Sequence, residues 1–332
     1  MKNWNNDMEK KIFRKYRFTL VFRVLRIMLA VFFLYAFYMI VINIAADQLN
    51  VTKKNLYFSI LALEWTTPNA TGSELSTDTK SEMNFFGTNE ITYPISKRIG
   101  TEQQFIGEAE IKKTFISYFS SINYSEQNSE ELPPFDFYLP KDPRTNESVD
   151  GSTNQSVWKS LEQLPEGTVG ELAFSTDKYM SPKELQSKLH DLDIMLLWMP
   201  LYTGEFIKYE PEGWSNSNDQ IAITDRLGLT PGIEHSSDYL LSSRYNSLSN
   251  IESSQNIMLK NMEDLLNQTK SYYTNFLNLK HLQAQYEYIK EEGFITYGAV
   301  VTGPVKELKK LEDLPFIQNE EIGEVELWNW DR

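Results

Sequence analysis

The feature that most constrains this chain is a run of twenty residues, 27–46, without a single charged side chain. A helix rises about 1.5 Å per residue, so a run of this length spans the roughly 30 Å hydrocarbon core of a bilayer. Arg23 and Arg26 precede the run, where they can extend to the lipid headgroups, and Asp47 follows it. The sequence therefore predicts one transmembrane helix over residues 27–46, with these three side chains at its boundaries.

The charge of the flanking segments predicts the orientation. Residues 1–26 carry eight Lys or Arg against two acidic residues. Because positive charge is retained on the cytoplasmic side, we expect this end in the cytoplasm and residues 47–332 outside. The alternative is a cleaved signal peptide, whose charged and apolar parts would both be shorter than these. Ile44 also occupies the position three residues before a cut after Ala46, where a small side chain is favoured. We therefore predict an uncleaved, single-pass anchor in the cell membrane.

The rest of the chain is strongly acidic. The formal net charge is −14, and since the tail carries +6, the remaining residues carry −20. Such a body repels nucleic acid and anionic lipid headgroups, so we expect no DNA or RNA partner, and the bilayer is contacted through the anchor. Cysteine is absent, which excludes disulfides, thiolate metal sites and a cysteine nucleophile.

The first exported region, residues 47–125, is predicted to be mainly β. Residues 112–118 carry an apolar face that suits either a strand or a short helix. Residues 126–156 are rich in Ser, Asn, Glu, Asp and Pro, which predicts a linker interrupted at 135–139. Apolar runs separated by turn-forming residues predict strands at 56–65, 83–86, 91–95 and 107–111.

The second exported region, residues 157–332, contains a weak internal repeat. Each copy is a strand, a helix that begins with Pro and Lys-Glu-Leu, and a second strand that contains Trp. Two such units predict a ferredoxin-like sheet with helices on one face, so we expect an α+β domain. Residues 251–292, between the copies, lack Pro and Gly and predict one long helix or two consecutive helices. The predicted strands cover residues 168–175, 194–201, 294–302 and 322–330.

Two sets of residues carry a resemblance to a known family. The first follows the basic tail and the apolar run within about 10–114, and comprises Leu63-Glu64-Trp65, Pro68 and Ile95-Ser96-Lys97-Arg98-Ile99-Gly100. The second, within 158–330, comprises Leu161, Leu164-Pro165-Glu166-Gly167-Thr168-Val169, Glu171, Phe174-Ser175, Leu197-Trp198, Tyr297-Gly298-Ala299-Val300-Val301-Thr302-Gly303-Pro304 and Leu327-Trp328-Asn329-Trp330. Together they resemble the sigma factor regulators of Gram-positive bacteria, a family that includes a membrane-bound negative effector of sigma-M.

The resemblance implies a membrane-anchored anti-sigma factor or its sensor subunit, which negatively regulates an extracytoplasmic-function (ECF) sigma factor in response to envelope stress. The partner would be that sigma factor, bound directly or through a second membrane protein. Members that bind a sigma factor directly usually have a longer cytoplasmic segment than the 26 residues found here. An interface of standard size needs about 20–30 residues a side. Such a short tail would bind weakly, bind jointly with another membrane protein, or belong to a sensor subunit only.

The candidate partner-binding residues lie in the tail. Basic and apolar residues alternate there, which predicts an amphipathic helix that can dock on an acidic sigma-factor surface. The same residues also suit a topology determinant that lies against anionic lipid. The set is Lys10, Lys11, Ile12, Phe13, Arg14, Lys15, Tyr16 and Arg17.

The sequence predicts no catalytic, cofactor-binding or metal site. His190, His235 and His281 are not at metal-ligand spacing, and His190 is interpreted as a helix-end contact near Asp191. Neither a nucleophile elbow nor a phosphate-binding glycine motif is present. We therefore expect no cofactor.

Two further groups have structural interpretations. Glu126, Glu130 and Glu131 are interpreted as a solvated charge run rather than a calcium or catalytic site. The strand residues Trp198, Trp328 and Trp330 are interpreted as core, with a ligand-stacking groove as the alternative.

Three functions are compatible with these observations. The first is the non-enzymatic regulator described above, which signals through one membrane helix. The second is an extracytoplasmic binding module for a cell-wall component or protein, with a simple membrane anchor. The third, an envelope enzyme that uses carboxylates, leaves no recognisable motif, and we do not expect it.

Overall fold

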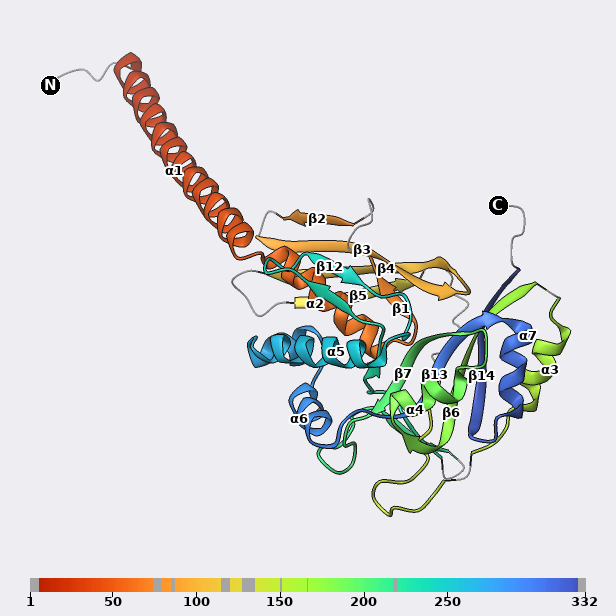
Figure 1. Cartoon of the computed structure of the whole chain (residues 1–332). Helices are drawn as coiled ribbons and strands as arrows, with labels where there is room; N and C mark the ends of the chain where they lie inside the picture. Colours follow the sequence, from red (N-terminus) through yellow and green to blue (C-terminus); the bar gives the residue numbers. More distant parts are fainter. Residues whose placement is uncertain are drawn as a thin grey trace.

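The apolar run lies in one long helix, α1 (Asn6–Gln48), which projects away from the rest of the chain (Figure 1). The computed structural model describes residues 6–73, 79–84, 87–114, 120–126, 135–149, 151–165, 167–217 and 220–327. Its part Met8–Gln48 is long and apolar enough to cross a membrane, and 6% of its most apolar window is buried. The predicted apolar helix is present, as the continuation of a helix that already begins in the basic tail.

A second helix, α2 (Val51–Thr66), follows after a two-residue turn. The prediction of a strand over residues 56–65 is wrong, because this segment is the body of α2. Every residue from Asn55 to Trp65 is buried. A helix that is apolar on all sides shows no 3.6-residue period, and its sequence therefore resembles a buried strand.

The first sheet is antiparallel and covers most of the N-terminal exported region. The strand predictions at 91–95 and 107–111 are confirmed, since they fall inside β3 and β4. Along β3, buried and half-buried residues alternate, as expected for a strand with one face against the core. Its strands are β1 (Ala70–Gly72), β2 (Lys80–Met83), β3 (Thr88–Ile99), β4 (Glu102–Thr114) and β5 (Ser120–Glu126), in the order β1-β3-β4-β5 with β2 also on β3.

The remaining predictions in this region are met in part. The strand expected at 83–86 has only residue 83 in β2, and residues 85–86 lie outside the described residues. Of residues 112–118, the first three belong to β4 and the others lie outside the described residues. In the expected linker, residues 135–149 contain only isolated bridges, and α3 (Gln155–Gln163) begins at its end.

The second sheet contains both copies of the predicted repeat. Each copy is a strand–helix–strand unit, and all neighbouring strands are antiparallel. The order β10-β7-β13-β6-β14 interleaves the two copies, so each unit has a strand of the other between its own two strands. The units are β6 (Thr168–Met180), α4 (Pro182–Leu189), β7 (Met195–Tyr202), and β13 (Ile295–Pro304), α7 (Val305–Leu308), a 3-10 turn η2 (Lys309–Asp313), β14 (Ile317–Leu327).

Hairpins and helices lie between the two copies. The expected helical segment 251–292 consists of two α-helices separated by a π-helical turn. The elements are β8 (Trp214–Ser217), β9 (Gln220–Ile223), β10 (Gly228–Leu229), β11 (Ile233–His235), β12 (Leu241–Arg244), α5 (Ile251–Leu266), η1 (Tyr272–Phe276) and α6 (Leu282–Glu292).

One hydrophobic core joins the two exported regions. Tyr57 of α2, Ile91 of β3 and Leu172 of β6 belong to the same buried cluster. A smaller cluster lies on the other face of the second sheet, where Phe137 packs with Trp198. Residues after α1 therefore form one packed body attached to that helix (Figure 1).

Candidate functional site

The tail forms the first turns of α1 and is exposed. Ile12, Tyr16 and Leu20 share one face, since residues four apart stack on a helix, and each is more than half exposed. The same spacing rule places Lys10, Arg14 and Arg17 on the opposite face. None of the basic side chains from Lys10 to Arg26 forms an ion pair with another residue that the structure describes. The segment is therefore helical and its surface is open to a partner or to lipid, while the docking role of the tail residues stays a prediction.

The far end of α1 contacts the exported body. Ile42 and Ala46 are buried, although both lie inside the predicted span. Gly87, in the turn before β3, packs on Tyr38 and Ile42, because a Cβ there would lie 3.3 Å from the Tyr38 hydroxyl and 3.2 Å from Ile42. The boundary residues Arg23 and Arg26 lie within α1, and Asp47 lies in its last turn. The body therefore packs on the last three turns of the apolar run instead of starting after it.

The α1–α2 connection is short and well defined. Asn50 adopts the left-handed conformation with φ 49° in the turn between the two helices, and α2 continues onward from the end of α1 into the body (Figure 1). The Asn89 side chain at the start of β3 donates a hydrogen bond to the Thr52 hydroxyl. A two-residue turn with a fixed backbone leaves little freedom between α1 and the body.

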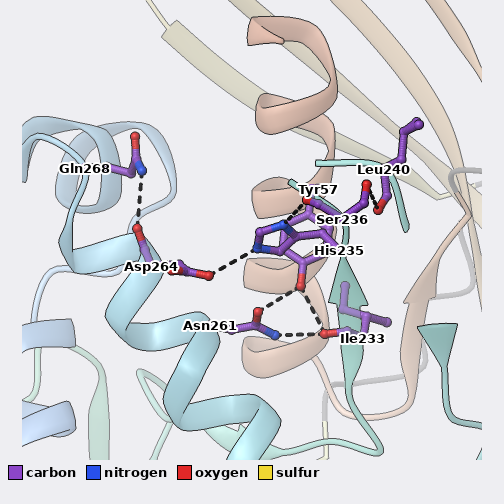
Figure 2. A network of polar contacts seen from close by, with 8 residues as sticks. All are labelled: Tyr57, Ile233, His235, Ser236, Leu240, Asn261, Asp264 and Gln268. Carbon is purple, nitrogen blue, oxygen red and sulfur yellow. Dashed lines mark hydrogen bonds and ion pairs between the residues drawn. The ribbon is translucent and has the colours of Figure 1, made fainter. Parts of the chain in front are cut away.

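Buried polar contacts fix α2 against the rest of the body (Figure 2). The Tyr57 hydroxyl lies 2.9 Å from the Asn261 side-chain oxygen on α5 and 3.0 Å from the Ile233 carbonyl on β11. Asn261 in turn donates to that carbonyl at 2.9 Å. All three groups are buried, so the hydrogen bonds determine one position for α2.

His235 extends this network toward the surface. Its Nδ1 lies 2.7 Å from the Ser236 carbonyl and its Nε2 lies 3.2 Å from the Asp264 carboxylate (Figure 2). Each ring nitrogen therefore faces an oxygen, one on the neighbouring backbone and one on α5. The ring also stacks on Tyr239 with 4.8 Å between centroids.

The residues of the first region that carry the family resemblance lie where this region contacts the second region. Glu64 is buried and receives a hydrogen bond from Arg244 on β12, while its backbone carbonyl accepts one from the Trp198 indole at 3.0 Å. Burial raises the pKa of Glu64, and the Arg244 guanidinium opposes that rise. Arg244 also donates to the Gly72 carbonyl at 2.7 Å and so joins α2, β1 and β12.

A second group of these residues surrounds Glu171 of β6. Its carboxylate accepts a hydrogen bond from Asn69 at 2.7 Å and lies 3.7 Å from the Lys97 ammonium. Burial raises the pKa of Glu171, while Lys97 and Asn69 lower it. Close by, the Gly100 amide donates to the Thr302 hydroxyl at 2.7 Å. The quoted motifs from the two regions thus meet each other, which gives them a packing role at the contact between the regions.

The residues of the second region's motifs also line a cleft of about 900 Å³. Its floor is formed where the start of β6 pairs with the end of β13, Val169 opposite Pro304. Lys306 and Lys309 line it as well, and Lys309 forms an ion pair with Glu162 at 3.7 Å. This volume is in the range of ligand sites. The remaining lining residues are Leu161, Leu164, Pro165, Gly167, Thr168 and Val305.

The three histidines lie in separate contacts, each beside a different Asp. His190 caps the end of α4, where its ring lies 3.5 Å from Asp191, and both side chains are exposed. His235 and His281 belong to separate contacts, with Asp264 and with Asp225. Among the described residues no cluster of three or more His, Asp or Glu could hold a metal ion.

The other single-residue interpretations have mixed outcomes. Trp198 is 1% exposed, which confirms its assignment to the core. Trp328 and Trp330 lie outside the described residues, as do Glu130 and Glu131. Glu126 is the last residue of β5. Sequence reasoning missed the contacts of α2 because they depend on its being a helix.

Comparisons with known proteins agree with the resemblance. The chain matches the model of the sigma factor regulator N-terminal domain over residues 10–104 and that of the C-terminal domain over residues 161–324. It is similar to a Bacillus subtilis (strain 168) protein named probable anti-sigma-M factor YhdL, with 26% identity over 262 residues. The alignment covers 76% of this chain and 63% of the relative, less than two thirds of that protein's length. No solved structure matches the chain.

Proposed function

The chain belongs to the sigma factor regulator family, as a distant homologue of a probable anti-sigma-M factor, and we propose that it is a membrane-anchored negative regulator of an ECF sigma factor. In this proposal α1 crosses the membrane once, with the tail in the cytoplasm and the packed body outside. The regulator is non-enzymatic: the body responds to envelope stress, and the tail holds the sigma factor directly or together with a second membrane protein.

The observation that carries the proposal is the continuity of α1. One helix runs from the exposed tail, through the apolar run, to a body that packs on its far end. A change in the body's position is thereby delivered to the tail without an intervening loop. The tail's face with Ile12, Tyr16 and Leu20 supplies an apolar strip, and its opposite basic face complements an acidic protein surface.

The test is the transcription of a sigma-dependent promoter in the native host. Removing residues 1–22 keeps Arg23 and Arg26 for topology, and we expect constitutively raised transcription because the docking helix is lost. Exchange of Ile12, Tyr16 and Leu20 for Ser leaves the charge of the tail unchanged. We expect this variant to raise transcription as well.

The matched controls separate docking from lipid contact. A variant with Lys10, Arg14 and Arg17 changed to Gln reduces only the basic face, and full derepression by it alone would identify charge as the main contribution. Copurification of the sigma factor with the parent but not with the apolar-face variant supports direct binding. Normal repression by the deletion variant would contradict the proposal.

The cleft at the end of the β6–β13 pair favours the second candidate function, an extracytoplasmic binding module. Its volume of about 900 Å³ suffices for a small ligand. If binding were the whole function, cleft variants such as V169D would abolish ligand binding, while tail deletion would leave transcription unchanged. The interleaved strand order supports the ferredoxin-like classification that we propose for this domain.

A further inference from the structure

Two lysines flank one buried ring near the point where α1 meets the body. Lys54 lies in the first turn of α2, and Lys113 lies near the end of β4. The Tyr272 ring centroid is 5.9 Å from the Lys54 Nζ and 5.1 Å from the Lys113 Nζ. Lys113 also lies over Phe276, with its Nζ 4.4 Å from that ring centroid. Both ammonium groups therefore lie against the same aromatic ring, and they are near enough for Lys54 to lower the pKa of Lys113.

Neither ammonium is paired with a carboxylate of the described chain. Among the described residues, the Lys54 ammonium donates a hydrogen bond to the neutral side-chain oxygen of Gln268, at 3.4 Å. Burial lowers the pKa of Lys54, and burial together with the nearby Lys54 lowers the pKa of Lys113. The lysines next to them in the sequence are paired with carboxylates: Lys53 with Asp238 at 3.1 Å and Lys112 with Glu110 at 2.9 Å. In a body that is otherwise acidic, this is a local and uncompensated positive site.

The surroundings of the two lysines favour an anion. The Asn50 side chain does not cap α2, and the first turn of this 16-residue helix contains no acidic residue. Its free N–H groups and its dipole therefore add positive potential. Val51, from that turn, lines a cavity of about 150 Å³ together with Lys113.

The position of the site indicates which anion reaches it. Lys54 follows the end of α1 by six residues, and Asn89, which pairs with Lys113 across the sheet, is two residues from Gly87. Gly87 packs on Tyr38 and Ile42 of the apolar helix. A helix that crosses the bilayer thus brings this end of the body to the headgroup region.

We propose that Lys54 and Lys113 bind the phosphate group of an outer-leaflet phospholipid, which seats the body on the membrane beside α1. Two half-buried ammonium groups in apolar surroundings bind phosphate more strongly than exposed ones, because less water competes. The bound phosphate also offsets the repulsion between them. The proposal depends on α1 crossing the membrane and not on what the tail binds.

The test uses full-length protein in maltoside micelles, titrated with phosphatidylglycerol, with bound lipid counted by native mass spectrometry. We expect lipid binding to weaken roughly five-fold for K54Q or K113Q and roughly thirty-fold for the double variant, from about 1 kcal/mol per basic residue. The tail contributes equally in every variant, so the comparison isolates the site.

The controls use charge and position. K53Q and K112Q, at lysines already paired, should bind lipid like the parent, and K54R/K113R should retain binding because charge is kept. Equal lipid binding by parent and by a folded K54Q/K113Q variant would overturn the proposal. Displacement of the lipid by an equal concentration of inorganic phosphate would also overturn it, and would assign the site to a free anion. Deletion of residues 1–22 leaves the site in place, so failure here is separable from failure of the sigma factor proposal.

Discussion

Single carboxyl groups in the body carry the clearest dependence on pH. The pKa of Glu321 on β14 is raised to about 7, mainly by burial and also by the charge of Asp136, while the Asp136 amide and Arg226 oppose the rise. The Asp136 amide donates to both carboxylate oxygens, at 3.3 and 3.2 Å. Because the folded-state pKa lies above the ordinary value of 4.5, the folded state holds an extra proton between these two values. The free energy of unfolding therefore falls as pH rises through that window.

This gives a prediction for E321Q. Glutamine keeps a side-chain oxygen for the Asp136 amide but does not ionise. We expect the parent to lose stability between about pH 5 and about pH 8, and E321Q to lose less over the same interval. Denaturant unfolding of full-length protein in micelles, followed by tryptophan fluorescence, measures the difference. E184Q, at an exposed surface pair with Lys178, is the control and should follow the parent. Identical pH profiles for E321Q and parent would contradict the assignment.

At the scale of elements, α2 shows what sequence reasoning can and cannot supply. The strands at 91–95 and 107–111 were predictable because one face of the sheet is more exposed, so polarity alternates. The helix α2 could not be predicted in this way, because Asn55 to Trp65 are all buried and the sequence shows no alternation of polar and apolar residues there. Ser181 at the start of α4 was predictable from local chemistry, and its hydroxyl accepts a hydrogen bond from the Glu184 amide at 3.1 Å.

Adjacent substitutions in α2 distinguish a buried helix from a strand with one exposed face. Ile60 and Leu61 are consecutive, and they are 2% and 1% exposed. We expect I60A and L61A each to lower the free energy of unfolding by about 2–5 kcal/mol, since each leaves a cavity. A strand with one solvent face would show the loss at only one of the two positions. Leu240, which is 43% exposed, serves as control, and L240A should cost less than about 1 kcal/mol. Denaturant unfolding of the full chain measures all three.

For the molecule as a whole, the motifs that suggested the family are mainly contacts between its two exported regions. Glu64 reaches Arg244, and Lys97 lies beside Glu171 across that boundary. The sequence could identify these residues but not their partners, because each pair is separated by more than seventy positions. The tail was predictable as an amphipathic helix, whereas its continuity with the body was not. That continuity depends on packing of Ile42 and Ala46 that no local pattern encodes.

Rigid attachment of the body to α1 leads to the last prediction. If the body and α1 move as one piece, a flexible Gly-Ser linker inserted after Leu49 uncouples the motion of the body from that of α1. The body and the helix should both still fold. We expect the sigma-dependent promoter to remain repressed in unstressed cells. An envelope-damaging treatment that induces the parent strain should no longer induce this variant. The same linker in the exposed turn between Asp142 and Glu147, a position outside α1 and α2, should leave induction intact. Normal induction with the linker after Leu49 would show that the signal passes by another route, such as cleavage of the chain, and not through the orientation of the body on α1.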